Sequence, residues 1–126
     1  MKEEGGVIRE NQYRNLIVWQ KSMFLVEKIY EKLLYFPKEE LYGLSSQIKR
    51  SAISIPSNIT ERKGRKTNKE FIQFLHIALG SLFELQTQLE LAEKLNMTRD
   101  ISEIKKITFE IEKMLNSLIN SKKDDK

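Results

Sequence analysis

Residues 67–96 read TNKEFIQFLHIALGSLFELQTQLELAEKLN and form the longest helical pattern in the chain. Thr67 followed by Glu70 has the spacing of a capping box, which begins a helix, and Asn96 is typical of a helix end. Apolar residues recur at intervals of three and four, the period of one helix face. We therefore predict a helix over 67–96 whose buried seam is Phe71, Phe74, Ala78, Ser81 or Leu82, Leu85, Leu89 and Ala92.

The same period predicts three more helices, at residues 13–36, 39–64 and 99–121. Pro37 ends the first, and Thr98 is expected to cap the last. Pro56 lies inside the second and removes a backbone donor, so we expect a kink there rather than a break. The expected seams are Leu16, Trp19, Met23, Val26, Tyr30 and Leu33 in the first; Leu44, Ile48, Ala52, Ile55 and Ile59 in the second; and Ile101, Ile104, Ile107, Ile111, Met114 and Leu118 in the last.

Helices of similar length joined by short connections predict an all-α protein, an antiparallel up-down-up-down four-helix bundle. The predicted bundle domain spans residues 13–121. It lies between a polar N-terminal tail, 1–12, and a charged C-terminal tail, 122–126. Neither a signal-peptide run nor an apolar segment of about 18 residues is present, so we expect a cytoplasmic protein that has no membrane partner.

The sequence contains few residues of the types that catalytic and metal sites require. The chain has no cysteine and a single histidine, His76, which argues against disulfides, thiolate sites and zinc. The Glu-x-x-His motif of di-iron bundles is absent because Gln73 stands three residues before His76. No nucleophile–base constellation is visible. We therefore predict no catalytic residue, no metal, no cofactor and no enzymatic activity.

Positive charge is concentrated in one part of the chain. The net charge is +4, and the only acid between positions 49 and 69 is Glu61. Lysine and arginine bind phosphates by releasing counterions, so this cluster predicts binding to RNA or DNA backbones. It contains no interleaved aromatic residue, and base stacking is not indicated. The alternative is a solvated, charged helix end. The cluster consists of Lys49, Arg50, Arg62, Lys63, Arg65, Lys66 and Lys69.

Apolar residues exceed what one core requires. A four-helix core needs about three apolar positions per heptad from each helix. The surplus favours a second buried surface between copies of the chain, although a wide core stripe is the alternative. We predict a homo-oligomer, and a protein-interaction adaptor that docks a partner protein is the alternative function. The predicted interface is a second line on the third helix, made of Ile72, Leu75, Leu79 and Phe83.

Six ordered motifs, spread over about residues 13–121, resemble the four-helix bundle family encoded by intervening sequences in bacterial 23S ribosomal RNA genes. They are Leu16–Lys21 (LIVWQK), Phe36–Glu40 (FPKEE), Tyr42–Leu44 (YGL), Gln47–Ala52 (QIKRSA), Ile55–Ile59 (IPSNI) and Phe74–Ser81 (FLHIALGS). The family's Ile-Pro-Ser-Asn-Ile-Ala-Glu-Gly run differs here, where Thr60 replaces Ala and Arg62 replaces Gly.

The resemblance implies an antiparallel four-helix bundle that assembles into a homopentameric ring. It also implies a build similar to the accessory proteins of diversity-generating retroelements, which bind nucleic acid. The family itself has no settled biochemical function, so the resemblance bears on fold and assembly more than on activity.

Overall fold

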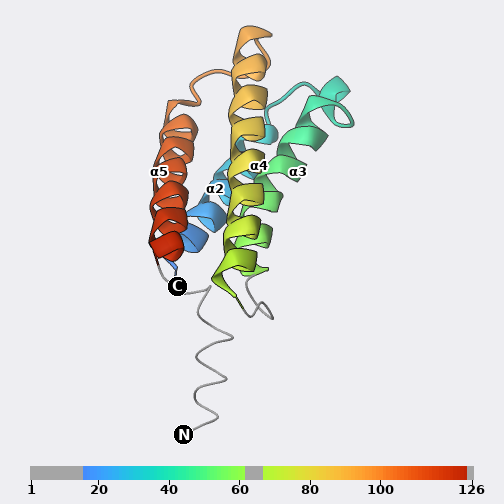
Figure 1. Cartoon of the computed structure of the whole chain (residues 1–126). Helices are drawn as coiled ribbons and strands as arrows, with labels where there is room; N and C mark the ends of the chain where they lie inside the picture. Colours follow the sequence, from blue (N-terminus) through green and yellow to red (C-terminus); the bar gives the residue numbers. More distant parts are fainter. Residues whose placement is uncertain (1–15, 62–66, 125–126) are drawn as a thin grey trace, which may run out of the picture.

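A computed structural model of the chain describes residues 16–61 and 67–124 (Figure 1). In these two ranges it contains four α-helices, one short 3₁₀ helix and no strand, so the predicted all-α helical bundle is confirmed. The elements are α2 (Ile17–Leu33), the 3₁₀ helix η1 (Lys38–Glu40), α3 (Leu44–Thr60), α4 (Asn68–Lys94) and α5 (Ser102–Asp124).

The four helices surround one core, because each packs against two others: α2 against α3 and α5, and α4 against α3 and α5. Polar side chains also meet across these seams. Along three of the seams, α3–α4, α4–α5 and α2–α5, the residue numbers rise on one helix as they fall on the other, so these paired helices run in opposite directions. The pairs are Ser51–Glu84 and Ser54–Ser81 between α3 and α4, and Gln86–Thr108 and Glu93–Lys105 between α4 and α5. Lys21 pairs with Glu110 between α2 and α5, and Lys32 donates to the carbonyl of Arg99, which precedes α5.

Local signals define the ends of α4 as predicted. The Thr67 hydroxyl accepts a hydrogen bond from the Glu70 backbone N–H at 3.1 Å, which confirms the helix start. The helix ends at Lys94, and Asn96 has a φ of 59°, a left-handed conformation that follows many helix ends. Both signals act over a few residues, so they operate independently of the rest of the fold.

The second predicted helix begins later than expected. Residues 38–40 form η1, and α3 starts only at Leu44, after Gly43, whose ψ of −114° is not helical. The Glu40 carboxylate accepts a hydrogen bond from the Leu44 N–H at 3.2 Å, so this acid caps α3 from outside the helix. Pro56 lies inside α3, which continues to Thr60, and the kink there stays a prediction. The predicted end near Gly64 lies outside the described residues.

The last predicted helix is shifted toward the C-terminus. It begins at Ser102, so the expectation that Thr98 caps it was wrong. Asp100 has a φ of 47°, which interrupts any earlier helical turn, and its carboxylate accepts a hydrogen bond from the Ser102 hydroxyl at 3.0 Å. At the other end α5 continues to Asp124, into the predicted tail. Lys122 and Lys123 occupy its last turn, where cations stabilise a helix.

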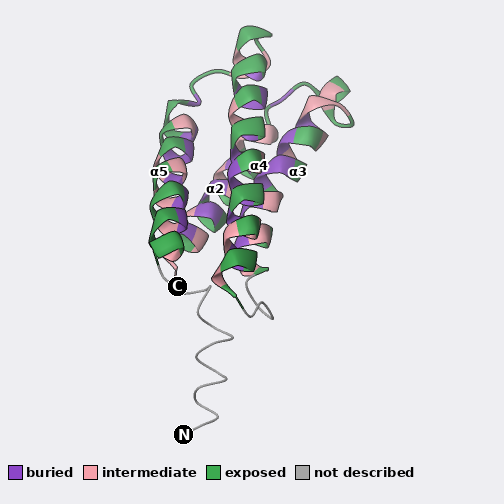
Figure 2. Cartoon of the chain, in the orientation of Figure 1, coloured by how far each residue is buried: buried purple, intermediate pink, exposed green. Residues whose placement is uncertain are grey.

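Figure 2 shows the buried positions facing the interior from all four helices. The predicted seams of the second, third and fourth helices supply most of this core. The seam predicted for the first helix was wrong by one position, because its buried residues are Val18, Ser22, Leu25 and Ile29. Trp19, Val26 and Leu33 pack against the core from its edge, whereas Met23 and Tyr30 are exposed.

One buried polar group has no hydrogen-bond partner within the described part of the chain. Gln88 is only 7% exposed, and its Oε1 atom accepts no hydrogen bond. Leaving a buried acceptor unsatisfied costs about 1–3 kcal/mol. We expect Gln88→Leu to raise the free energy of unfolding by about 1 kcal/mol in urea denaturation.

Gln86→Leu is the matched control for this substitution. The Gln86 amide donates to the Thr108 hydroxyl at 3.2 Å and to the Glu112 carboxylate at 3.3 Å. Its replacement should therefore destabilise the protein. If the two variants shifted stability in the same direction, the unsatisfied oxygen would not be the cause.

Candidate nucleic-acid interface

The three members of the predicted basic cluster that the structure describes do not lie together. Lys49 and Arg50 lie in the first half of α3, whereas Lys69 lies in the first turn of α4. From Lys49 to the end of α3 the helix rises about 16 Å. The Lys49 ammonium also lies 5.1 Å from the centre of the Tyr30 ring, so it faces α2. These two cations are therefore separated from Lys69.

The other four cations, Arg62, Lys63, Arg65 and Lys66, lie outside the described residues. In the sequence they join Glu61, which follows α3, to Thr67, which precedes α4. Their four positive charges equal the net charge of the whole chain, +4. The rest of the chain is therefore electrically balanced, and this connection carries the excess.

The structure brings further cations to the same end of the bundle. α3 and α5 end there and α4 begins there, as their antiparallel pairing requires (Figure 1). Lys122 and Lys123 in the last turn of α5 therefore lie at the same end as Lys69. Sequence reasoning missed both lysines because it assigned them to a tail. Glu61, Glu70 and Asp124 lie at this end too and offset the three lysines, so the connection 62–66 decides the sign of its charge.

Two hollows with mostly apolar linings lie along the seam between α2 and α3, and together they are called the α2–α3 groove. One hollow of about 310 Å³ is lined by Trp19, Met23, Val26, Ile53, Pro56, Ser57 and Thr60. Another of about 350 Å³ is lined by Tyr30, Leu33, Leu34, Phe36, Pro37, Lys38, Leu41, Ser45 and Lys49. The α2 side of the groove is the heptad line that was expected to face the core. Trp19 in particular was predicted to lie buried in the seam, and it is only partly buried, at the groove wall.

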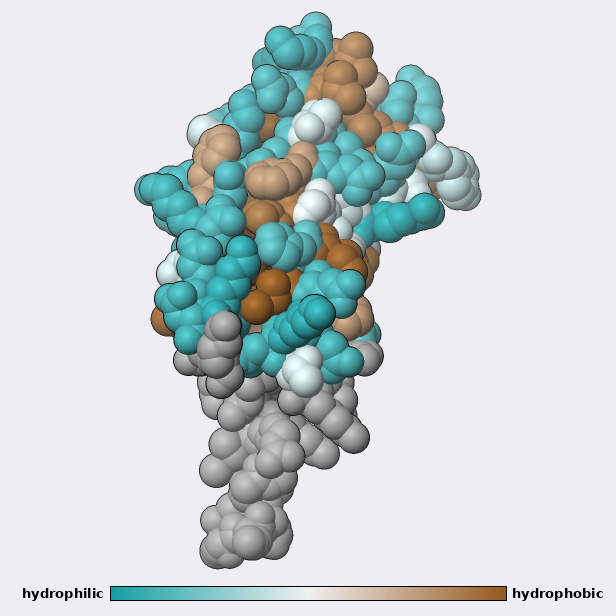
Figure 3. All heavy atoms as spheres, viewed as in Figure 1, coloured by the Kyte–Doolittle hydropathy of each residue, from teal (hydrophilic) through white to brown (hydrophobic). Residues whose placement is uncertain are grey.

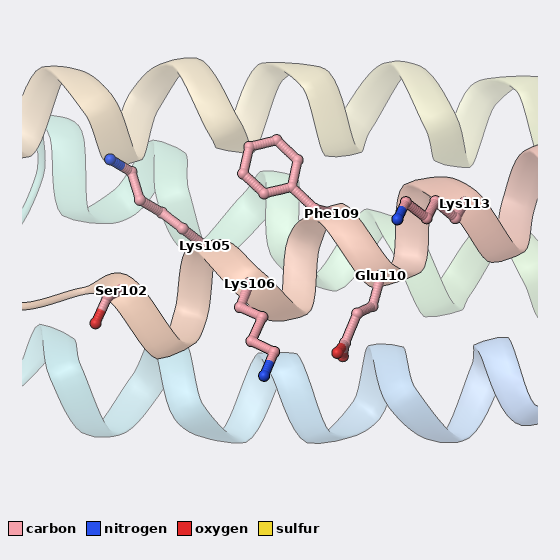
Figure 4. A pocket seen from close by; sticks show the side chains of 6 residues that line it. All are labelled: Ser102, Lys105, Lys106, Phe109, Glu110 and Lys113. Carbon is pink, nitrogen blue, oxygen red and sulfur yellow. The ribbon is translucent and has the colours of Figure 1, made fainter.

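The outer face of α5 carries a third hollow, of about 450 Å³. Figure 4 shows its side chains: Phe109 and Lys105 lean toward α4, and Lys106 and Glu110 lean toward α2. Glu110 accepts a hydrogen bond from the Lys21 ammonium at 2.8 Å, which lowers the pKa of the Glu110 carboxyl below its usual value. Lys105 lies 2.6 Å from the Glu93 carboxylate, whose hydrogen bond raises the pKa of that lysine.

The predicted interface line on α4 does not form a surface. Leu75 and Leu79 are 0% and 8% exposed and belong to the core of their own chain, and Ile72 packs against that core. The wide core stripe therefore accounts for these residues, because α4 packs against both α3 and α5. Phe83 alone remains exposed, at 44%. Figure 3 shows apolar side chains interrupting the hydrophilic surface on the side of α4 that faces the viewer.

His76 is exposed on α4. No group of three or more histidine, aspartate or glutamate side chains is placed to hold a metal ion in residues 16–61 and 67–124. Across the same ranges, no helix has the length and apolarity needed to cross a membrane.

Comparison with known proteins places this architecture in a family. The family model described as "23S rRNA-intervening sequence protein" matches residues 14–117. A solved structure from Bacteroides thetaiotaomicron VPI-5482, described as a protein of unknown function from the S23 ribosomal protein family, is 32% identical with a TM-score of 0.73. That likeness covers 82% of this chain and 96% of the other. No curated protein sequence matches significantly. The match over most of its length shows that the chain belongs to the 23S rRNA-intervening sequence protein family.

Proposed function

We propose that the protein is a non-enzymatic, cytoplasmic, homo-oligomeric scaffold that binds the phosphate backbone of RNA or DNA through one end of its bundle. The observation that carries this proposal is the charge distribution. Arg62, Lys63, Arg65 and Lys66 hold the whole positive excess of the chain in five consecutive positions. Without these four residues the chain carries no net charge. A polyanion is therefore expected to bind at the end of the bundle to which they belong.

Binding of this kind needs no base contacts. Each lysine or arginine that neutralises a phosphate releases a counterion, and the entropy of release favours the complex. Lys69, Lys122 and Lys123 lie at the same end, where Glu61, Glu70 and Asp124 balance their charge, so the connection supplies the excess. The expected ligand is therefore recognised by its charge and shape rather than by its sequence.

A titration of short labelled RNA and DNA duplexes by fluorescence anisotropy, repeated over a series of salt concentrations, tests the proposal. The logarithm of the binding constant should fall linearly with the logarithm of the salt concentration, with a slope of about −0.9 for each phosphate that the protein neutralises. Duplexes of different sequence should bind alike. Absence of binding at low salt, or a slope near zero, would contradict the proposal.

The proposed interface between copies of the chain is the groove between α2 and α3. Trp19, Met23, Val26, Tyr30 and Leu33 follow heptad spacing, which is typical of a helix that packs against another helix. The core uses mainly a different line of α2, and the exposed side chains of this second line, Met23 and Tyr30, are open to contact with another copy. The family resemblance predicts a homopentamer. A ring would present the basic end five times, which raises avidity without any new contact.

Ile53→Glu tests this assembly surface. Ile53 is 43% exposed in the groove, and a carboxylate buried there between copies would be costly. Light scattering should show that the variant's mass falls toward that of a single chain. Ile17→Glu, on the exposed part of α2 away from the groove, is the matched control and should assemble as the wild type does. Equal masses for both variants and the wild type would place the interface elsewhere.

A protein-interaction adaptor is the second candidate function. The observation that favours it is the lining of the same groove, which is apolar and includes Lys38 and Lys49 but no acid. Such a groove suits an amphipathic helix with an acidic edge. Weak dependence of partner binding on salt would favour this adaptor, because apolar contacts are little affected by counterions.

A further inference from the structure

The outer face of α5 presents an aromatic ring among cations. Phe109 is 54% exposed, although burial is the usual state of a phenyl ring in a folded protein. Lys105, Lys106 and Lys113 precede and follow it by four, three and four positions. Residues at these spacings are neighbours on a helix surface; Lys105 leans with the ring toward α4, whereas Lys106 leans toward α2 (Figure 4). All four side chains line the same hollow (Figure 4).

The acids near this ring are already engaged. Glu110, the only acid in the lining, is paired with Lys21 at 2.8 Å. Lys105 is paired with Glu93 at 2.6 Å. Neither Lys106 nor Lys113 forms an ion pair with any residue that the structure describes. The surface beside Phe109 therefore carries two lysines without a close ion pair in the described ranges, and their charges act at longer range on the Glu110 carboxyl, whose pKa they help to lower.

The volume of the hollow on α5 and its exposure to solvent determine which anion it can bind. The hollow of about 450 Å³ is large enough for a nucleotide-sized group and lies open on the surface rather than enclosed. An exposed aromatic face binds a nucleobase by stacking, and neighbouring lysines contact the phosphates on either side. The bases of a duplex are already stacked inside the helix and cannot reach such a ring. Only unpaired nucleotides can use both parts of this surface.

We propose that the outer face of α5 binds single-stranded nucleic acid, with one base stacked on Phe109 and the adjoining phosphates held by Lys106 and Lys113. This inference rests on the proposed nucleic-acid function and specifies it. The basic end attracts any polyanion, and the α5 face adds a preference for unpaired segments. A structured RNA with a loop beside a helix could occupy both surfaces.

Phe109→Ala tests the stacking contact, with labelled oligouridine and a labelled RNA duplex as the two probes. Removing one stacked base should weaken oligouridine binding roughly 5- to 100-fold. Duplex binding should stay within about twofold, because phosphate contacts do not involve the ring. Oligothymidine should behave as oligouridine does, since stacking does not use the sugar hydroxyl. Tyr42→Ala removes another highly exposed aromatic side chain, at the loop before α3, and should leave both affinities unchanged.

A second variant, Phe109→Trp, tests the same stacking contact by fluorescence and does not depend on the result for Phe109→Ala. Trp19 is the only tryptophan of the chain, so Phe109→Trp adds one reporter at the proposed binding face. Oligouridine should quench the emission of this variant more than that of the wild type, and the duplex should not.

Each failure has its own signature. If neither probe binds the wild type, the proposed function itself is wrong. If both bind and Phe109→Ala weakens neither, or weakens both equally, the α5 inference is overturned while backbone binding stands. If Phe109→Ala changes the mass of the assembly, the ring belongs to an interface between copies, and the inference is likewise overturned.

Discussion

Leu82→Ala should lower the free energy of unfolding by about 3–5 kcal/mol. Leu82 is fully buried on α4, the helix that packs against both α3 and α5. The substitution removes three carbon atoms from the core, and helices held by packing on both sides cannot close fully around the cavity. The lost transfer free energy and the cavity therefore add to each other.

Leu91→Ala makes the same chemical change on the same helix and serves as the control. Leu91 is 45% exposed, so its truncation should cost less than about 1 kcal/mol. Urea denaturation at one fixed protein concentration gives both values, since the stability of an oligomer depends on concentration. Similar decreases for the two variants would contradict the assignment of Leu82 to the core.

Replacing Arg62, Lys63, Arg65 and Lys66 together with alanine should weaken RNA and DNA binding by a factor on the order of 10²–10³ at about 0.1 M salt. The slope of the salt dependence should flatten by about one unit for each phosphate that the variant no longer neutralises. RNA and DNA of any sequence should be affected alike. Weaker binding to one sequence only would indicate base readout instead.

A charge-matched variant separates the position of these cations from their number. Lys32, Lys38, Lys94 and Arg99 are also four cations, and they lie at the opposite end of the bundle. Lys32 and Lys94 are in the last turns of α2 and α4, Lys38 is in η1, and Arg99 lies between α4 and α5. Replacing them with alanine lowers the net charge equally. This variant should keep most of the affinity and the slope. If both quadruple variants bound as the wild type does, the basic connection would be a solvated surface, and the adaptor would become the better proposal.

The sequence predicts most of the core because three of the helices have one dominant apolar face. Ile48, Ala52, Ile55 and Ile59 recur on one side of α3, and all four are fully buried. The first helix is different, because α2 carries two apolar lines. The line through Trp19 and the line through Val18 are one residue apart, and both follow intervals of three and four. Periodicity cannot choose between them.

The candidate sites were harder to predict than the core. The cluster of cations in the sequence mixes residues from the first half of α3 with Lys69 of α4, and only the paired directions of α3, α4 and α5 show which cations share an end. In the sequence, Phe109 counts only among the surplus apolar residues outside the predicted seam of the last helix. Its ring beside three lysines becomes visible only when α5 is placed with its opposite side against the core.

By itself, the sequence determined the helices, the cap at Thr67, the end of α4 and the excess of positive charge in residues 62–66. These features depend on neighbours within about one or two turns of the chain, where hydrogen bonds and side-chain spacing act locally. The tertiary structure decided which stripe of α2 is buried, that Leu75 and Leu79 belong to the core, and that α5 exposes Phe109. Those outcomes depend on how α3 and α5 approach α2 and α4, and burial is a property of the packed helices together rather than of any one segment.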